Sequence, residues 1–291
     1  MSDGTGLVMP TIVGRARTLA TQRMLGSGPR EIFAAGRSPC VVAFHGFTGT
    51  AAELRPVLTA VASAGYAVDA ALMPGHGTGA EQLQDRTFDE WVGAARERVR
   101  EAIAVHGQVV LLGFSLGSLV AMQIASERPE GLVGLVVLGN ALTLTAGSRW
   151  PLGLWARTGW AMPDIYLVKP RPGDLIDDTH ADQLVTYDRH PLRAALEVYR
   201  AGPRVQERVV YIDCPTLVLH GRRDGVCPWS NAPWLASHIG TREVDVKVYE
   251  RSAHVVAWDG EREAVASEVV SFLARRAGTV NAAAPASARG R

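Results

Sequence analysis

The chain has 291 residues, of which 47% are hydrophobic and 20% are charged, and its formal net charge at pH 7 is +1. This length and composition predict a globular protein with a large core, at the upper limit of one α/β domain. A nearly neutral chain argues against nucleic acid or an anionic membrane surface as a partner, and no segment approaches the ~18 consecutive apolar residues of a membrane span.

The two ends of the chain are expected to lie outside the main domain. Residues 1–30 are small, polar and Arg-containing, and we interpret them as an N-terminal extension whose pattern allows a short helix around Ile12–Leu25. They lack the basic start and apolar stretch of a signal peptide, which favours a cytoplasmic location. Residues 277–291 are rich in Ala, Pro and Ser without periodicity, so a disordered tail is predicted.

Residues 31–139 and 209–276 form the predicted core, in which short apolar runs alternate with amphipathic segments. In chain order the runs are CVVAFHG, YAVDAAL, QVVLLGF, GLVGLVVLG, PTLVLHG and VDVKVYE. The amphipathic segments lie near residues 51–64, 88–105, 116–128, 230–239 and 262–275. Buried strands that alternate with helices predict an α/β fold, with a mostly parallel sheet and helices on both of its faces.

The alternation fails once, between residues 140 and 208, and this segment is expected to form an inserted cap. It contains several prolines together with Trp150, Trp155 and Trp160. Because the segment follows a strand end, it would lie over the sheet edge where open α/β proteins bind their ligands. The tryptophans then indicate an apolar surface that lines or covers a site.

The run VVLLGFSLGSLVAMQIA, residues 109–125, places one hydroxyl between two glycines where a strand meets a helix. Such a turn takes its apical residue through a strained backbone angle, and glycines on both sides remove the Cβ atoms that would clash there. Ser115 occupies the apex of this G-x-S-x-G pattern, which is typical of the nucleophile elbow. The alternative is a glycine-rich turn with an idle serine.

A serine hydroxyl becomes a nucleophile when a base takes its proton, and the base needs an acid that orients it. Three histidines that adjoin strand ends could reach the same edge: His45, His76 and His220. The chain order of this fold is Ser, then acid, then His. That order favours His254, in the loop RSAH after the last apolar run, because it leaves room for an acid before it.

Asp224 is the predicted acid, because it follows the run PTLVLHG and so belongs at the same sheet edge. Asp213 precedes that run, Asp245 lies inside a strand, and Asp259 comes after the histidine. The alternative for Asp224 is an aspartate held by its own turn.

The oxyanion of the reaction needs preorganised N–H donors. One is the N–H of Leu116, directly after the nucleophile, and the second is expected from Phe47 in the loop HGFTGT. His45 is interpreted as a structural hydrogen-bonding residue. The three cysteines, Cys40, Cys214 and Cys227, have neither disulfide nor zinc spacing, so no metal or cofactor is expected and Cys40 and Cys214 are assigned to the core.

Taken together, the motifs resemble the α/β-hydrolase superfamily and, within it, bacterial carboxylesterases and monoacylglycerol lipases. They are FHGFTGT, LRPVLTAVASAGYAV, MPGHGTGAEQL, TFDEWV, LLGFSLGSL, PTLVLHGRRDGVCP and ERSAHVVAWD. The resemblance runs from about Glu31 to Arg275. The chain departs from the family pattern at Ser118, where a second glycine is common, and in the composition of the cap.

By motif, the resemblance implies that Ser115 is the nucleophile, Asp224 the acid and His254 the base. It also implies that the N–H groups of Phe47 and Leu116 form the oxyanion hole. We therefore predict a metal-free serine hydrolase that cleaves a small-molecule carboxylic ester through an acyl-enzyme.

Two tryptophans beside the acid and the base, Trp229 and Trp258, would fit an apolar acyl or aryl pocket, although core packing explains them equally well. A thioesterase, a macrolactone-forming enzyme or an acyltransferase would use the same triad. An alternative from another class is a non-catalytic ligand-binding protein on a hydrolase scaffold. The sequence does not specify an oligomeric state.

Overall fold

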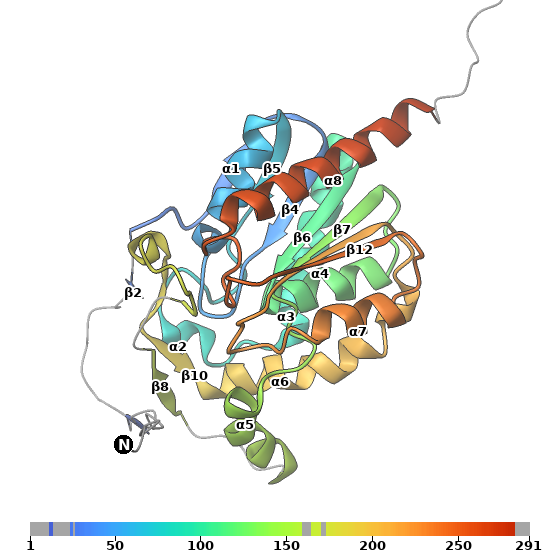
Figure 1. Cartoon of the computed structure of the whole chain (residues 1–291). Helices are drawn as coiled ribbons and strands as arrows, with labels where there is room; N and C mark the ends of the chain where they lie inside the picture. Colours follow the sequence, from blue (N-terminus) through green and yellow to red (C-terminus); the bar gives the residue numbers. More distant parts are fainter. Residues whose placement is uncertain (1–11, 14–23, 26, 159–163, 170–172, 283–291) are drawn as a thin grey trace, which may run out of the picture.

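A seven-stranded sheet forms the centre of the computed structural model, which describes residues 12–13, 24–25, 27–158, 164–169 and 173–282 (Figure 1). The strand order is β12-β11-β7-β6-β4-β5-β3. The strands are β3 (Ile32–Ala34), β4 (Arg37–Phe44), β5 (Tyr66–Ala70), β6 (Val109–Phe114), β7 (Leu132–Leu138), β11 (Thr216–Gly221) and β12 (Val244–Tyr249). In this order, each strand from β12 to β5 pairs in parallel with the next one. The edge strand β3 pairs antiparallel to β5. The predicted mostly parallel sheet is confirmed.

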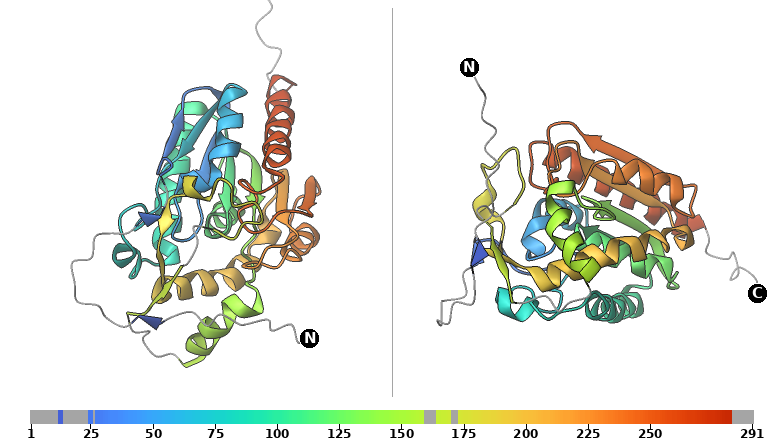
Figure 2. Two further views of the ribbon diagram at one scale, coloured as in Figure 1. Left: turned by 60° about the vertical axis from the view of Figure 1, so that its left-hand side comes forward. Right: turned by 90° about the horizontal axis from the view of Figure 1, so that it is seen from below.

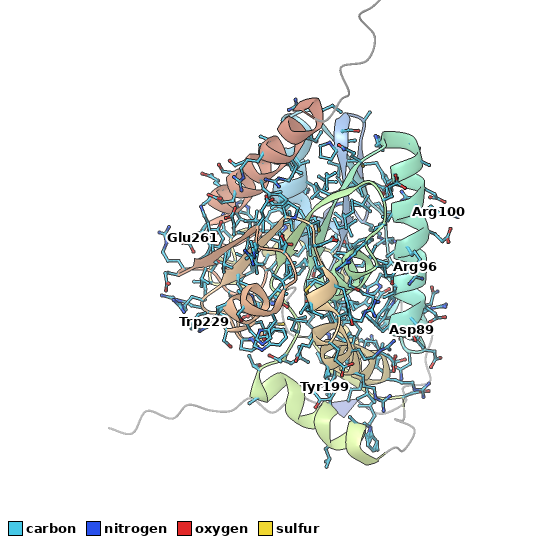
Figure 3. All side chains as sticks on the ribbon, turned by 90° about the vertical axis from the view of Figure 1, so that its right-hand side faces the viewer. Asp89, Arg96, Arg100, Tyr199, Trp229 and Glu261 are labelled. Atoms are coloured by element: carbon cyan, nitrogen blue, oxygen red, sulfur yellow. The ribbon has the colours of Figure 1, made fainter. Side chains whose placement is uncertain are left out.

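Helices cover both faces of this sheet, as predicted (Figures 1 and 2). One face packs against η1 (Ala51–Leu54), α1 (Arg55–Ser63) and α8 (Arg262–Ala282). The other packs against α3 (Phe88–His106), α4 (Leu116–Ser126) and α7 (Asn231–His238), while α2 (Ala80–Leu83) follows β5. Amphipathic spacing explains this layering: α3 buries Trp91 and Val99 and turns Arg96 and Arg100 outward (Figure 3).

The segment 140–208 leaves the sheet at the carboxyl end of β7 and forms a layer beyond that edge (Figure 1). Its elements are α5 (Ala146–Thr158), β8 (Tyr166–Val168), η2 (Ala181–Gln183), β9 (Thr186–Tyr187), β10 (Arg189–Pro191) and α6 (Leu192–Gln206). The turn η3 (Val209–Tyr211) follows and leads back to β11. We call residues 140–208 the cap.

The N-terminal residues pair with the cap as strands. β1 (Ile12–Val13) pairs antiparallel to β8, and β2 (Met24–Leu25) pairs antiparallel to β9. The sequence allows a short helix around Ile12–Leu25, and this prediction is wrong for residues 12–13 and 24–25, which are strands. Residues 14–23 lie outside the described part. Short cap strands have free edges, and their unpaired N–H and C=O groups offer partners to these residues.

At the other end, α8 continues to Ala282, six residues beyond the point at which the sequence predicts a disordered tail. Residues 283–291 lie outside the described part, so the prediction for them stays a prediction. Cys40 and Cys214 are buried and free, as expected. Within the described residues, no helix combines the length and the apolar character needed to cross a bilayer. The predicted cytoplasmic location stays a prediction.

Candidate active site

Ser115 occupies the turn between β6 and α4 with φ 53° and ψ −116°, a backbone conformation that L-residues rarely adopt. The two glycines make this turn possible. A Cβ on Gly113 would lie 2.2 Å from the carbonyl oxygen of Gly117, and one on Gly117 would lie 2.0 Å from that of Phe44. The departure at Ser118 supports the turn, because its hydroxyl donates to the carbonyl of Ser115 at 2.6 Å.

The structure brings the three predicted triad residues together at the carboxyl ends of β6, β11 and β12. His254 Nε2 lies 3.0 Å from Ser115 Oγ, and His254 Nδ1 lies 2.7 Å from Asp224 Oδ2. All three are nearly buried, with exposed fractions of 9% for Ser115, 8% for Asp224 and 7% for His254. These contacts form a continuous path from hydroxyl to imidazole to carboxylate.

The carboxylate of Asp224 is held from several sides. Its Oδ1 accepts the N–H groups of Val226 at 2.8 Å and Cys227 at 2.7 Å. Its Oδ2, which accepts from His254, also lies 2.9 Å from Nε2 of His220. Burial alone would raise the pKa of Asp224, but the two histidines outweigh it and hold the pKa well below its ordinary value. The acid is therefore a carboxylate at neutral pH.

This carboxylate in turn sets the state of His254. Burial alone would lower the pKa of His254, but the charge and hydrogen bond of Asp224 outweigh it and keep the pKa above its ordinary value. Asp174 in the cap and Glu53 near the site act in the same direction. The surroundings thus stabilise the imidazolium form of His254.

Two backbone N–H groups, that of Leu116 directly after Ser115 and that of Phe47, have no acceptor among the described residues. Leu116 opens α4, whose N-terminus carries the positive end of the helix dipole. The loop before Phe47 is fixed by its neighbour, because the N–H of Gly46 donates to Glu53 Oε2 at 2.8 Å. The role of these two N–H groups as an oxyanion hole stays a prediction.

His45 connects the loop that contains Gly46 and Phe47 to Met73, in the loop after β5. Its Nδ1 donates to the carbonyl of Gly46 at 2.9 Å, and its Nε2 accepts the N–H of Met73 at 3.1 Å. Burial lowers the pKa of His45 to about 4, so the ring is neutral and keeps this arrangement. The contacts fit the structural role expected for His45.

A cavity of about 320 Å³ opens beside Ser115 and His254. Most of its wall is apolar and comes from the cap and two core loops. The aliphatic lining residues are Leu144, Leu152, Leu167, Leu192, Ala195, Val198, Val226 and Val255. A cavity of this size and composition fits a hydrocarbon chain.

One corner of the cavity is polar and was not predicted from the sequence; we call Glu53, Lys169 and His190 the polar corner. Lys169 Nζ donates to Thr186 Oγ1 at 2.8 Å, and burial lowers the pKa of Lys169 to about 8. Burial raises the pKa of Glu53 to about 7, opposed by the charge of Lys169. The ring of His190 stacks on that of Phe47, with centroids 5.8 Å apart.

Other expectations about side chains are corrected by the structure. Neither Trp229 nor Trp258 lines the cavity. Trp229 is 39% exposed and lies beneath Arg222 at the surface (Figure 3). Trp258 is buried and donates its indole N–H to the carbonyl of Ala52. Trp155 packs in the cluster of α5 and α6 behind the cavity wall. Trp160 and the side chain of Trp150 lie outside the described residues.

Asp259, the aspartate after the histidine, has a structural role. It is buried, and its carboxylate accepts the N–H groups of Ala253, Ile176 and Asp177 at 2.7–3.0 Å. It therefore joins the loop of His254 to the cap.

The described residues contain one cluster with metal-ligand spacing, formed by Asp224, Cys227 and His254. The carboxylate and the imidazole already bind each other, and burial raises the pKa of the Cys227 thiol well above its ordinary value. A protonated thiol is a poor metal ligand, so the triad explains this cluster better than a metal does.

Comparison with known proteins agrees with this geometry. Residues 37–261 match the family described as serine aminopeptidase, S33. A thermostable monoacylglycerol lipase from a Bacillus species is 27% identical over 252 residues, covering 87% of this chain and 97% of the relative. A carboxylesterase of Bacillus subtilis is 23% identical, covering 84% and 96%. In structure, a metagenome-derived lipolytic enzyme superposes with a TM-score of 0.76 at 22% identity, covering 86% of this chain and 99% of that one.

Proposed function

Because the chain belongs to the serine aminopeptidase S33 family of α/β-hydrolases and is a serine hydrolase of the carboxylesterase or lipase type, we propose that Ser115, His254 and Asp224 are its catalytic triad. The observation that carries the proposal is the pair of hydrogen bonds that His254 makes, at 3.0 Å to the hydroxyl and 2.7 Å to the carboxylate. Among the described residues, His254 is the base that contacts this hydroxyl, as activation of a serine requires.

In the proposed reaction, Ser115 Oγ attacks the ester carbonyl carbon while its proton passes to His254 Nε2. The negative oxygen of the tetrahedral intermediate binds the N–H groups of Phe47 and Leu116. The intermediate collapses, the bond to the alcohol oxygen breaks, and that oxygen takes the proton from His254. Water then attacks the acyl-enzyme, His254 takes one of its protons and returns it to Ser115 Oγ, and the carboxylic acid leaves.

The lining of the cavity favours an ester with an apolar acyl chain and a polar alcohol part. The apolar wall from the cap would bind the acyl chain, and the polar corner would bind the alcohol part through the ammonium of Lys169 and the carboxyl of Glu53. Monoacylglycerol lipases, which the chain resembles, act on esters of this kind, so we propose glyceryl and other esters with a polar alcohol as substrates. Thioester hydrolysis and acyl transfer would use the same triad.

The test is an activity profile with a matched variant. Purified protein and Ser115→Ala are assayed on p-nitrophenyl esters and monoacylglycerols of increasing chain length, and on aminoacyl p-nitroanilides. We expect ester cleavage that rises with chain length, little anilide cleavage, and a loss of about 10⁴-fold or more in the variant.

A fluorophosphonate probe should label the protein and leave Ser115→Ala unlabelled, because labelling needs an activated serine. Ester cleavage in the variant within tenfold of the starting protein would contradict the role of Ser115. Faster cleavage of anilides than of esters would contradict the ester substrate. Faster acyl transfer to an added alcohol or thiol than to water would favour the acyltransferase alternative.

A further inference from the structure

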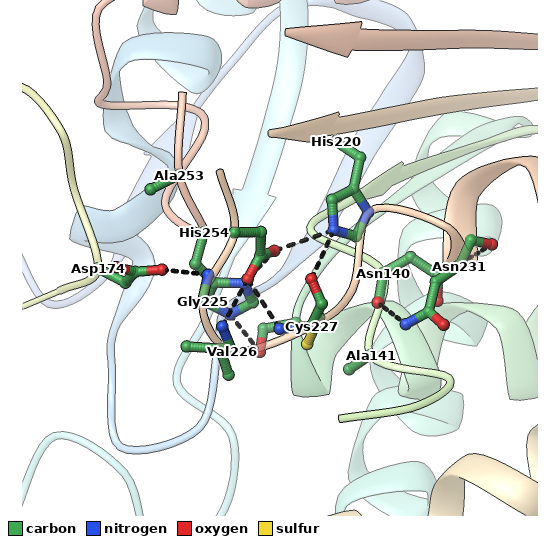
Figure 4. Close-up of polar contacts among 12 residues, drawn as sticks. Asn140, Ala141, Asp174, His220, Gly225, Val226, Cys227, Asn231, Ala253 and His254 are labelled. Carbon is green, nitrogen blue, oxygen red and sulfur yellow. Dashed lines mark hydrogen bonds and ion pairs between the residues drawn. The ribbon is translucent and has the colours of Figure 1, made fainter. Parts of the chain in front are cut away.

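His220 is a fully buried histidine at the end of β11, four residues before the triad acid. Its Nε2 lies 2.9 Å from Asp224 Oδ2 and 3.2 Å from the carbonyl oxygen of Cys227. Figure 4 shows His220 and His254 converging on the turn that contains Gly225 and Cys227. His220 does not line the cavity, so any effect on catalysis must act through Asp224.

The contacts fix where the hydrogen of His220 lies. Both neighbours of Nε2, a carboxylate and a carbonyl, are acceptors, so Nε2 carries a hydrogen and donates it. Nδ1, on the other side of the ring, is buried and has no partner among the described residues. The interaction of Nε2 with Asp224 and Cys227 therefore holds the ring in place. It must also offset the free-energy cost of burying Nδ1 without a hydrogen-bond partner.

The oxygen that His220 binds is the one that also binds His254. Oδ2 of Asp224 thus receives hydrogen bonds from two imidazoles, while Oδ1 receives two backbone N–H groups. A carboxylate has about four lone-pair positions, and here each is occupied. Each added donor spreads the negative charge further and leaves less of it for any one partner.

We propose that His220 is a positioning residue of the triad: it completes the hydrogen bonds around the carboxylate of Asp224 and competes with His254 for the charge of Oδ2. The inference rests on the proposed triad. Without His220, the carboxylate is less firmly held, so kcat falls. At the same time, more of its charge acts on His254, so the imidazolium is stabilised and the acid limb of the pH profile moves to higher pH.

The other charged groups around this assembly make contacts that do not involve His220. His254 faces Asp224, Asp174 from the cap and Glu53 from η1. The Asp174 carboxylate accepts the N–H of Gly225 at 2.8 Å, independently of His220. Around His220 itself, the turn after β11 contributes Asp224 and the protonated thiol of Cys227. A shift of the acid limb of the pH profile in a His220 variant therefore reports on the charge of Asp224 Oδ2, which both histidines contact.

The experiment compares His220→Leu with His220→Gln in kcat, KM and the pH dependence of kcat/KM on one p-nitrophenyl ester. Leu fills the space without a donor, whereas the Gln amide reaches the position of Nε2 and keeps an N–H. We expect kcat of the Leu variant to fall about tenfold, from the loss of one hydrogen bond to a charged group. KM should stay within about twofold, and the acid limb should move up by about half a pH unit or more. The Gln variant should stay close to the starting protein in all three.

A role in packing alone predicts a different result. If His220 only supported the fold, its loss would loosen the contact between Asp224 and His254, and the acid limb would move down or stay unchanged. Either outcome with folded protein would overturn the inference, as would a Gln variant that loses as much as the Leu variant. If the Leu variant does not fold, His220→Asn replaces it, because its shorter amide keeps the polarity but does not reach Oδ2.

Asp224→Asn separates this inference from the proposed function. If that variant keeps full activity, the triad itself is wrong. If it loses activity while His220→Leu matches the starting protein, the triad stands and the role of His220 is contradicted.

Discussion

Glu53 is a buried carboxylic acid whose Oε2 accepts the N–H of Gly46, next to the proposed oxyanion donor Phe47. Its pKa is raised from 4.5 to about 7, because burial disfavours the charged form more than Lys169 and the N–H group of Gly46 favour it. A carboxyl whose pKa is higher in the folded state contributes stability that is fully present below its unfolded pKa. That contribution is lost as the pH rises through the folded pKa.

We therefore predict that Glu53→Gln becomes more stable relative to the starting protein as the pH rises from about 4.5 to 7. The shift sets a ceiling of about 3 kcal/mol on the change in relative free energy of unfolding. The measurement is urea unfolding of both proteins at pH 5, 6 and 7. His45 and His190, whose pKa values are lowered to about 4 and about 3, titrate in both proteins and cancel. A stability difference that does not change with pH would show that Glu53 is ionised throughout.

The difference between the triad and the polar corner shows what the sequence can reveal about single residues. Ser115, Asp224 and His254 are each fixed by a strand end that the local sequence predicts, so their meeting follows from the topology of a parallel sheet. Lys169 and Glu53 come together across the cap and the core, and no local pattern encodes that meeting. His220 lies between these cases: its strand end was noted, but its contact with the acid depends on the path of the turn 224–227.

At the scale of elements, the elbow between β6 and α4 depends on the close approach of their backbones. We predict that Gly117→Ala lowers the free energy of unfolding by about 3 kcal/mol or more and abolishes activity, because its Cβ would lie 2.0 Å from the carbonyl oxygen of Phe44. Gly93→Ala is the matched control. Gly93 lies inside α3 with open space where a Cβ would be, so the substitution should raise stability by about 0.5–1 kcal/mol. Thermal unfolding and ester cleavage measure both; an active, stable Gly117→Ala would mean that α4 can shift freely.

Within the cap, α5 offers a matched pair of leucines for testing how the acyl chain is bound. Leu152 is 5% exposed and lines the cavity, whereas Leu154 on the same helix is 61% exposed. Each buried methylene of a matched chain contributes ~0.8 kcal/mol, or about fourfold in kcat/KM per carbon. Leu152→Ala should therefore flatten or shift the dependence on chain length and leave acetate cleavage within a few-fold. Leu154→Ala should change neither, and equal effects from the two would contradict the assignment of the cavity to the acyl chain.

For the whole molecule, the alternation of apolar runs and amphipathic segments was sufficient to predict the sheet and its two helical layers. It was sufficient because the central strands β4, β6, β7 and β11 are buried on both faces and read as nearly continuous apolar runs. The edge strand β12 instead alternates apolar and polar residues, which also predicts a strand. β3 was missed because it is a short edge strand, with Phe33 exposed between the half-buried Ile32 and Ala34. The cap strands were missed for a similar reason: strands of two or three residues are too short to show a period, and their partners lie far away in the chain.

The cap also consists of two parts that the sequence did not distinguish. Helix α6 packs in the main core cluster together with α4; its buried residues Ala194, Ala201 and Val205 have no exposed surface. At Gly202 the helix approaches the carbonyl oxygen of Leu142 so closely that a Cβ would lie 2.4 Å from it. Helix α5 instead packs in a small separate cluster with the outer side of α6. The cap is continuous in sequence, but α6 packs as part of the main core and α5 does not.

This division predicts how the molecule opens. Amide hydrogens exchange by the cheapest opening that exposes them, and residues in one cooperative core share the free energy of global unfolding. In hydrogen-exchange mass spectrometry of the native protein, peptides from α6 should therefore be protected as strongly as those from α4. Peptides from α5 should exchange faster, through local opening that leaves the sheet intact. If α5 and α6 exchange together and faster than α4, the cap opens as one body, and substrate would enter by lifting all of it rather than by displacing α5 from a fixed α6.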